Sequence, residues 1–237
     1  MMVDIHQHVI YGVNDGPGDD AGMRRMLRLA AEQGVAHLVA TPHATPGREP
    51  FPTEAYLSRV AEAQAWCAAQ GLPLKVHTGC ELLYTDDTPR LLHEGYLPTL
   101  AETWMVLVEF FPADTIERMC HALRCLGNEG FTVVMAHVER YRALQSMRNV
   151  AMLRNEYQVK MQMNCNTILS RKGFFKDRWT HRMLEAGYID CVASDAHNTS
   201  SRPCAMRACM NALTDRYGRE MAKRLCGDNQ RQWLMLN

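Results

Sequence analysis

Short apolar segments rich in β-forming residues alternate seven times with longer amphipathic segments along this chain. Strands and helices that alternate in this way build parallel sheets, because each helix returns the chain to the starting edge of the sheet. No Pro-, Gly- or Ser-rich linker interrupts the series, so we expect one α/β domain over residues 1–237. The expected strands are Met2–Ile5, His37–Ala40, Leu74–Thr78, Met105–Phe110, Thr132–Ala136, Val159–Asn164 and Ile189–Ala193.

Helix-start signals lie between these strands. We expect Asp19 or Asp20 to cap the first helix, Thr53 the second and Asp114 a third, because short polar side chains satisfy free amide groups at helix starts. Amphipathic spacing predicts further helices over about 143–156, 177–186 and 203–225.

A polar or metal-capable side chain follows each expected strand, which decides between two sheet architectures. An open doubly wound sheet would spread these side chains along an edge too long for one site. In a β/α barrel the carboxyl ends of all strands converge on one rim, so we expect a barrel with its site there. The side chains in chain order are His6, His8, Asp15, His43, Glu81, Glu109, His137, Asn164, Asp195 and His197.

Five histidines and four carboxylates of that rim are candidate metal ligands. Nitrogen and oxygen donors without a thiol suit Mn, Fe, Zn or Mg. Nine donors are more than one ion binds, so the residues predict a site for either two or three ions. Three divalent ions would outweigh the four carboxylates and favour an anionic substrate such as a phosphate monoester. Arg140 and Arg202, in the loops that carry His137 and His197, are candidate phosphate contacts.

The segments MVDIHQH, NDG, ATPH, TGCELLY, LVEF, AHVERY and SDAHN occur in this order. Together they make the chain similar to the polymerase-and-histidinol-phosphatase (PHP) superfamily, over nearly its whole length. Within it the chain most resembles the bacterial protein-tyrosine phosphatases that regulate capsular and exopolysaccharide synthesis. This resemblance implies a distorted seven-stranded, TIM-like β/α barrel that binds three divalent ions. Manganese is the ion it implies first, and Fe, Zn or Mg are the alternatives.

The resemblance also implies a role for each matching residue. It makes Arg140 a phosphate-binding residue and Arg202 a second contact to the anion. His43 and His197, if not fully committed to metal, are the candidate proton donors. The implied metal ligands are His6, His8, Asp15, His43, Glu81, Glu109, His137, Asp195 and His197.

The expected reaction is hydrolysis of phosphotyrosine by a metal-activated hydroxide, since metal ions lower the pKa of bound water from 15.7 towards about 7. Tyrosine phenolate, with a conjugate-acid pKa near 10, leaves more readily than a serine alkoxide. The implied partner is a phosphotyrosine protein, the tail of a tyrosine autokinase. Cationic residues after the sixth strand are candidate contacts to that tail, namely Arg171, Lys172, Lys176 and Arg178.

Three other functions compete with this one. Cys165 and Arg171 have the CX5R spacing of cysteine-dependent tyrosine phosphatases, but no glycine lies between them to form the phosphate loop. Histidinol phosphatase, or another PHP phosphoesterase, would use a similar cluster. A non-catalytic regulator that binds phosphopeptides through a metal-containing site is the alternative of another class.

Composition excludes several classes of protein. Lys and Arg number 26 and Asp and Glu number 26, which argues against a strongly basic nucleic-acid-binding protein. No apolar run approaches the roughly 18 residues of a membrane span, and acidic residues near the start argue against a secretory signal. Nine cysteines without a CxxC pair are typical of reduced thiols, so we expect a cytoplasmic protein whose oligomeric state stays open.

Overall fold

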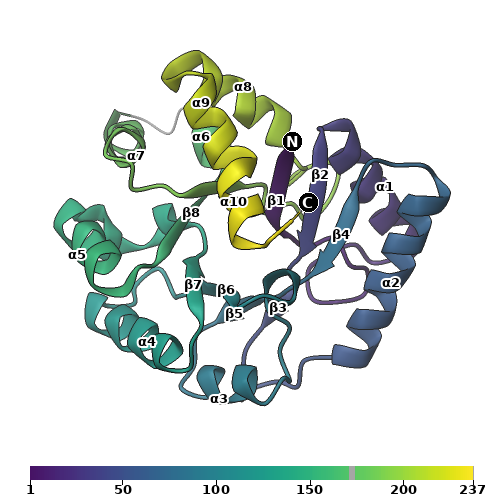
Figure 1. The fold of residues 1–237 in the computed structure, drawn as a ribbon, viewed down its shortest axis with the longest axis horizontal. Helices are drawn as coiled ribbons and strands as arrows, with labels where there is room; N and C mark the ends of the chain where they lie inside the picture. Colours follow the sequence, from purple (N-terminus) through teal and green to yellow (C-terminus); the bar gives the residue numbers. More distant parts are fainter. Residues whose placement is uncertain (171–173, 237) are drawn as a thin grey trace.

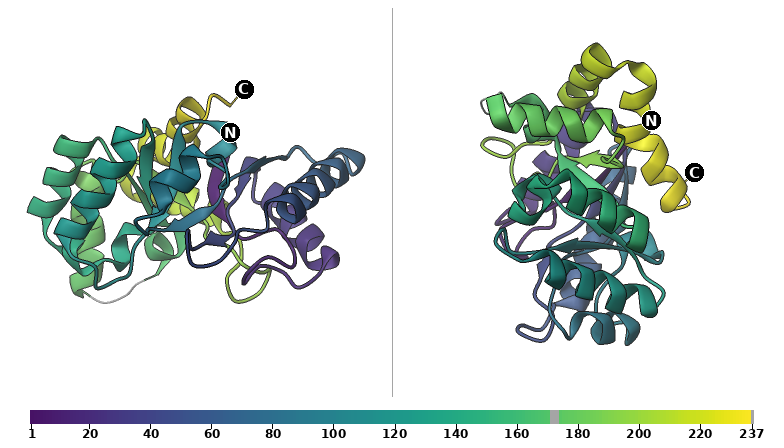
Figure 2. Two further views of the ribbon diagram at one scale, coloured as in Figure 1. Left: turned by 90° about the horizontal axis from the view of Figure 1, so that it is seen from below. Right: turned by 90° about the vertical axis from the view of Figure 1, so that its left-hand side faces the viewer.

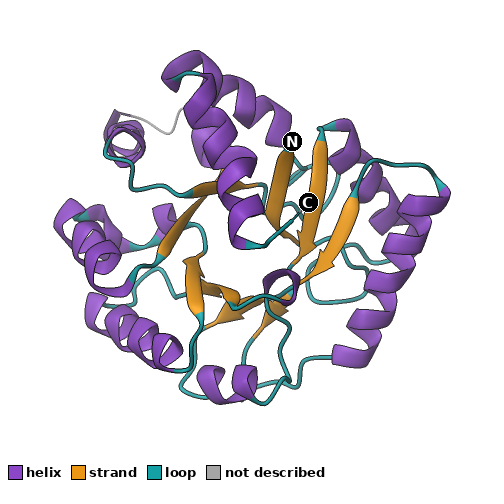
Figure 3. Ribbon diagram, in the orientation of Figure 1, coloured by secondary structure: helices purple, strands orange, loops and turns teal. Residues whose placement is uncertain are grey.

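A curled sheet of parallel strands with helices outside it makes up the fold (Figures 1 and 3). The structure, a computed structural model, describes residues 1–170 and 174–236. One sheet has the order β1-β2-β4 and a second the order β3-β5-β6-β7-β8-β9. The strands are β1 (Met2–Gln7), β2 (Val35–Ala40), β3 (His43–Ala44), β4 (Lys75–Thr78), β5 (Glu81–Leu83), β6 (Met105–Glu109), β7 (Thr132–Met135), β8 (Lys160–Asn164) and β9 (Cys191–Ala193).

Each of the seven expected strands is present, but the expected closed ring of seven is not confirmed. Two positions are split, because β2 stops before Thr41-Pro42 and resumes as β3, and β4 stops before Gly79-Cys80 and resumes as β5. Pro42 has no amide hydrogen to donate to a neighbouring strand. At Gly79 a Cβ atom would lie 2.7 Å from Cγ1 of Val39, so the two split positions approach too closely for a side chain there.

Tyr56, in helix α2 (Thr53–Ala69), contacts the backbone at both breaks. Its hydroxyl oxygen lies 2.8 Å from the carbonyl oxygen of Ala40 and 2.9 Å from that of Gly79, and it accepts the amide hydrogen of Gly79 at 2.9 Å. The side chain is fully buried. Peptide groups that lose their strand partner at the breaks therefore bond to a tyrosine instead.

We expect Tyr56→Phe to lower the free energy of unfolding by about 1–3 kcal/mol, because it leaves buried peptide groups without a partner. Urea denaturation of the purified variant measures this loss. Tyr11→Phe is the matched control, since its hydroxyl bonds to Glu62 at an exposed position, 3.0 Å away. Equal stability of Tyr56→Phe and wild type would show that the hydrogen bonds of the Tyr56 hydroxyl do not stabilise the breaks.

The two sheets meet again between β1 and β9. Gln7 and Ala196 form a parallel bridge, and the amide of Asp195 donates to the carbonyl oxygen of His6 at 2.8 Å. The buried Asp4 carboxylate accepts from the Ser194 amide at 2.9 Å and from its hydroxyl at 2.5 Å. These contacts join the first strand to the last and bring the two ends of the sheet together.

The helices cover the outer face of the sheet (Figure 2). Asp19 caps the first helix, as expected, by accepting the amide hydrogen of Gly22 at 2.7 Å. Two other cap predictions were wrong. Thr53 lies inside α2 with Pro52 at the cap position, and Thr115 rather than Asp114 caps helix α4 (Ile116–Asn128). Asp114 instead accepts from the Phe111 amide.

The α-helices are α1 (Asp20–Glu32), α2 (Thr53–Ala69), α3 (Thr88–His93), α4 (Ile116–Asn128), α5 (Met147–Tyr157), α6 (Cys165–Leu169), α7 (Phe174–Glu185), α8 (Met206–Tyr217), α9 (Arg219–Lys223) and α10 (Asn229–Trp233). Short helices of other types are Leu100–Glu102, Val138–Arg140, Arg142–Gln145 and Arg224–Asp228. Within residues 1–170 and 174–236, no helix is long and apolar enough to cross a membrane.

Two hydrophobic cores hold these layers together. The larger lies between strands and helices, and the smaller fills the inside of the curl with residues such as Val3, Ile5 and Leu107. Leu100, before β6, and Leu234, after α10, belong to the smaller core. The end of the sheet where the strands finish carries the polar side chains.

Candidate metal centre

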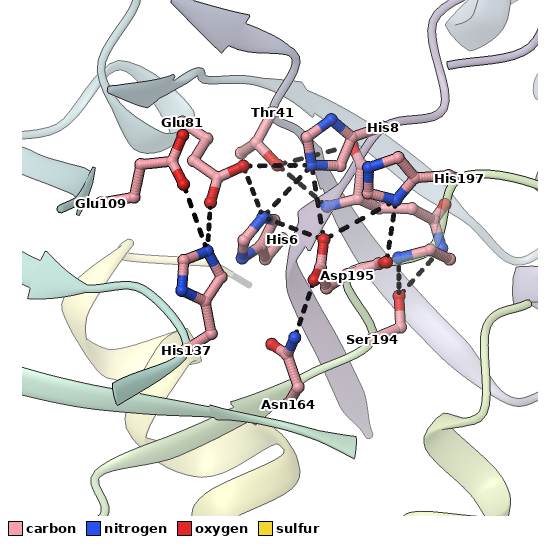
Figure 4. Close-up of polar contacts among 12 residues, drawn as sticks. His6, His8, Thr41, Glu81, Glu109, His137, Asn164, Ser194, Asp195 and His197 are labelled. Carbon is pink, nitrogen blue, oxygen red and sulfur yellow. Dashed lines mark hydrogen bonds and ion pairs between the residues drawn. The ribbon is translucent and has the colours of Figure 1, made fainter. Parts of the chain in front are cut away.

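The structure brings all nine candidate ligands together at the carboxyl ends of the strands. Figure 4 shows most of them, namely His6, His8, Glu81, Glu109, His137, Asp195 and His197. His6 lies in β1, and His8 and Asp15 follow it. His43 and Glu81 begin the short strands β3 and β5 and are partners in register. The split of two strands therefore places these two ligands opposite one another.

The first group of donors surrounds the end of β1. His6 Nε2 lies 3.3 Å from His8 Nε2, and both nitrogens lie within 3.2 Å of Glu81 Oε2 and 3.5 Å from Asp195 Oδ1. All four residues are buried. Two imidazole nitrogens and two carboxylate oxygens thus face one small volume.

The second group shares Glu81 with the first. The other Glu81 oxygen, Oε1, lies 2.6 Å from Nε2 of His137, and Glu109 Oε2 lies 3.6 Å from the same nitrogen. His43 Nδ1 lies 3.0 Å from Glu81 Oε2 and 3.2 Å from Glu109 Oε1. Glu81 is therefore placed to bridge two cations through its two oxygens.

The third group lies on the solvent side and contains Asp15, His43, His8 and His197. Asp15 Oδ2 lies 2.9 Å from His197 Nε2, and Asp15 Oδ1 lies 3.4 Å from His8 Nδ1 and 3.8 Å from His43 Nε2. Overlapping sets within the nine residues place one donor atom of each member within 4.8 Å of the others. These sets are His8–Asp15–His43–His197, His6–His8–Glu81 and His43–Glu81–Glu109.

Two candidate ligands of this centre have strained backbone conformations. His137 has φ of 31° and Asp195 of 52°, both in the left-handed region that non-glycine residues rarely occupy. Asn14, next to Asp15, has φ of 48°, a conformation that asparagine tolerates better than most residues. Such conformations persist where the surrounding structure over-determines them, and they cluster at functional sites.

The carboxylates and imidazoles shift one another's pKa values. Burial opposes ionisation of Glu81, but the charge of His6 and hydrogen bonds from His137, His43 and His6 outweigh it and hold the Glu81 pKa well below its usual range. Burial lowers the His43 pKa, yet hydrogen bonds to Glu109 and Glu81 raise it to about 9. The His197 pKa falls to about 4, because burial and the neighbouring His8 outweigh the pull of Asp195.

Three buried atoms of the described part of the centre lie 2.9–3.4 Å from other candidate ligands but form no well-aligned hydrogen bond: His8 Nδ1, Glu81 Oε2 and His197 Nε2. An unsatisfied buried polar atom costs free energy, so such atoms in a native site require an explanation. Each of them belongs to a histidine or carboxylate that faces other donors of the same kind. The donor set therefore fits divalent cations, which take nitrogen and oxygen ligands of this type.

Both arginines singled out from the sequence contact one oxygen of Asp195. Arg140 Nη2 lies 2.6 Å and Arg202 Nη2 3.0 Å from Asp195 Oδ2, whereas Oδ1 faces His6 and His8. The arginine side chains are 43% and 40% exposed, so solvent reaches this edge of the centre. Asp195 thus separates the histidines from the guanidinium groups.

Sequence reasoning missed several residues that support the ligands. Gln162, in β8, contacts His6 and the backbone of His137. Tyr141 places its hydroxyl 3.3 Å from His137 Nδ1, and Asp4 holds Ser194 beside Asp195. Asp4 and Gln162 are polar residues within apolar strands, and this pattern could have indicated a role for them.

A curled parallel sheet, with clustered histidines and carboxylates at its strand ends and two adjacent arginines, defines a PHP-type metal-dependent phosphatase. More narrowly, the chain belongs to the capsular polysaccharide synthesis family CpsB/CapC, whose family model matches residues 2–235.

Named relatives agree with this assignment. The chain is 30% identical to the tyrosine-protein phosphatase CpsB of Streptococcus pneumoniae over 247 residues, covering 99% of this chain and 98% of the relative. It is 28% identical to the tyrosine-protein phosphatase YwqE of Bacillus subtilis, covering 93% and 87%. A crystal structure from the study of YwqE and CpsB, described as unique metal-dependent tyrosine phosphatases, matches with a TM-score of 0.87 and 26% identity, covering 99% and 94%.

The cysteine-dependent alternative loses support at Cys165. This residue is fully buried, and its thiol lies 3.4 Å from Sδ of Met206. A hydrogen bond with Cys209 lowers the Cys165 pKa, but burial and nearby anions raise it to about 11, whereas a catalytic cysteine needs a depressed value. Arg171 and Lys172 lie outside the described residues, as does the side chain of Lys176.

We expect Cys165→Ala and Cys165→Ser to leave the turnover of phosphotyrosyl peptide close to the wild-type rate. The thiol is buried and faces Met206, so neither change reaches the candidate metal centre. Steady-state kinetics on the folded variants measures this, with circular dichroism to verify folding. Abolished turnover in both folded variants would revive the cysteine mechanism.

Proposed function

We propose that this chain is a metal-dependent protein-tyrosine phosphatase. The observation that carries the proposal is the cluster of five histidines and four carboxylates, most of them buried, beside two half-exposed arginines that meet at Asp195. Relatives with the same fold carry the name tyrosine-protein phosphatase, and the matching structure is described as metal-dependent. The substrate is then a phosphate monoester of tyrosine.

The centre, on this proposal, holds three divalent ions, with manganese as the first choice and Fe, Zn or Mg as alternatives. His6, His8, Glu81 and Asp195 would hold one ion; Glu81, Glu109 and His137, with His43 alongside, a second. Asp15, His43 and His197, with His8, would hold the third. Bound ions of this kind act as Lewis acids towards phosphate oxygens and lower the pKa of a bound water.

The chain's own residues supply the remaining steps. Arg140 and Arg202 bind and orient the phosphate by donating from their guanidinium forks to its oxygens. Because phenolate has a conjugate-acid pKa near 10, little protonation of the leaving oxygen is needed. His43 and His197 remain the candidate proton donors if they are not fully committed to metal.

The setting of this reaction is part of the proposal. The family description concerns capsular polysaccharide synthesis, which supports the phosphotyrosine tail of an autokinase as the substrate. Free cysteines throughout the described chain support a reducing, cytoplasmic location. We also treat residues 1–237 as one domain. In it, β2 with β3 and β4 with β5 each count as one strand of a seven-stranded barrel.

Metal-stripped protein assayed with added Mn, Zn, Mg or Fe tests the proposal. We expect no turnover without metal, recovery with manganese, and faster hydrolysis of phosphotyrosyl than of phosphoseryl peptide. Histidinol phosphate serves as the competing substrate, and preference for it would identify a different phosphatase. Tight phosphopeptide binding without hydrolysis by the metal-loaded protein would identify a regulatory module.

A further inference from the structure

Strand β8 brings two buried amide side chains to the candidate metal centre, where the neighbouring strand ends bring candidate ligands. Side chains alternate along a strand, and in β8 Met161 and Met163 lie in the outer core. Gln162 and Asn164 therefore face the inside of the curl, and they are 0% and 6% exposed. Buried amides are costly unless bonded, so their partners show what they do.

The oxygen of Gln162 accepts two hydrogen bonds from the centre. The backbone amide of His137 donates to Oε1 at 2.8 Å, which fixes the orientation of the Gln162 amide, since only an oxygen can accept there. His6 Nδ1 lies 3.2 Å from the same oxygen. Nδ1 of His6 must then carry a hydrogen, so the neutral His6 ring has its lone pair on Nε2, which faces His8 and Glu81.

The bonds continue from Gln162 to the opposite side of the centre. Gln162 Nε2 donates to Asn164 Oδ1 at 2.8 Å. Asn164 Nδ2 donates to Asp195 Oδ2 at 2.7 Å (Figure 4). Asp195 and His137 are the two candidate ligands in left-handed conformations. One amide of β8 thus bonds to each strained residue, to the side chain of Asp195 and to the backbone of His137.

We propose that Gln162 and Asn164 are positioning residues that hold His6, His137 and Asp195 ready for metal. Gln162 keeps His6 in the tautomer whose Nε2 can bind a cation. Asn164 keeps Asp195 Oδ2 bonded when the arginines turn to a phosphate, so that Oδ1 stays directed at the histidines. The inference rests on the proposed metal centre, and it concerns residues that contact neither metal nor phosphate.

Zinc affinity of the full chain, measured by calorimetry on metal-stripped protein, tests this inference. We expect Gln162→Met to bind Zn²⁺ about 10–100-fold more weakly, the usual cost of losing a group that orients a ligand. Gln162→Glu keeps an acceptor for His6 and His137 and should restore most of the affinity. Gln64→Met, a change on the exposed face of α2, is the matched control and should bind as wild type.

A tautomer measurement separates positioning from general stability. In zinc-loaded, ¹⁵N-histidine-labelled protein, we expect a slowly exchanging His6 Nδ1–H signal in wild type and Gln162→Glu, lost in Gln162→Met. Asn164→Ala should keep this signal but weaken zinc binding, and it serves as the test if Gln162→Met does not fold. Wild-type affinity in Gln162→Met, or in Asn164→Ala, would overturn the inference, whereas absence of zinc binding by wild type would refute the metal centre itself.

Discussion

Glu81→Gln is expected to remove bound metal and to lower kcat/KM for a phosphotyrosyl peptide by about 10³-fold or more, since Lewis-acid stabilisation supplies several kcal/mol. One Glu81 oxygen faces three imidazoles at 3.0–3.2 Å and the other faces His137 at 2.6 Å. The amide has the same shape, but it carries no charge and turns N–H donors towards imidazole nitrogens. Elemental analysis and steady-state kinetics measure the two losses.

The control for this change is Glu94→Gln, which removes a carboxylate from an exposed pair with Arg90 on α3. It should leave metal content and turnover unchanged. If Glu81→Gln kept its full metal content and most of its activity, Glu81 would not be a bridging ligand, and the proposed centre would need another arrangement.

The sequence predicted the strands of this fold better than their breaks. Runs of β-forming residues placed all seven strand positions, because a buried parallel strand needs an apolar run whatever its neighbours are. The break at Gly79 depends on its approach to Val39, a contact between segments 40 residues apart that no local pattern contains. The cap at Thr115 was missed by one residue because Asp114 is an equally good capping residue.

The candidate ligands were predictable for a different reason. Histidines and carboxylates at successive strand ends form motifs, and the topology that gathers them follows from the strand and helix alternation. Gln162 belongs to none of the matching segments, and Ser194 begins SDAHN without being a candidate ligand; both act here only through hydrogen bonds. The partners of these bonds became visible only in the structure, although a polar residue inside an apolar strand was a signal for Gln162.

Arg140 and Arg202 lie where they can leave Asp195 and contact a phosphate. Arg140 and Arg202 share Asp195 Oδ2 with Asn164, so three donors converge on one oxygen. Because Asn164 still donates to Asp195 Oδ2, the two guanidinium groups can leave this oxygen at a modest cost in free energy. A phosphate dianion offers each of them two oxygens in the geometry that an arginine fork prefers.

We therefore expect the double variant Arg140→Ala with Arg202→Ala to lower kcat/KM for phosphotyrosyl peptide by about 10³-fold, given that one lost donor to a developing charge costs about 10²–10³. Metal content should stay at the wild-type level, because neither side chain belongs to the proposed ligand set. Lysine at both positions should restore part of the loss by returning charge without the fork. Arg142→Ala, at an exposed neighbouring position, should match wild type. A double alanine variant that loses less than tenfold would mean that phosphate is bound by the metal ions alone.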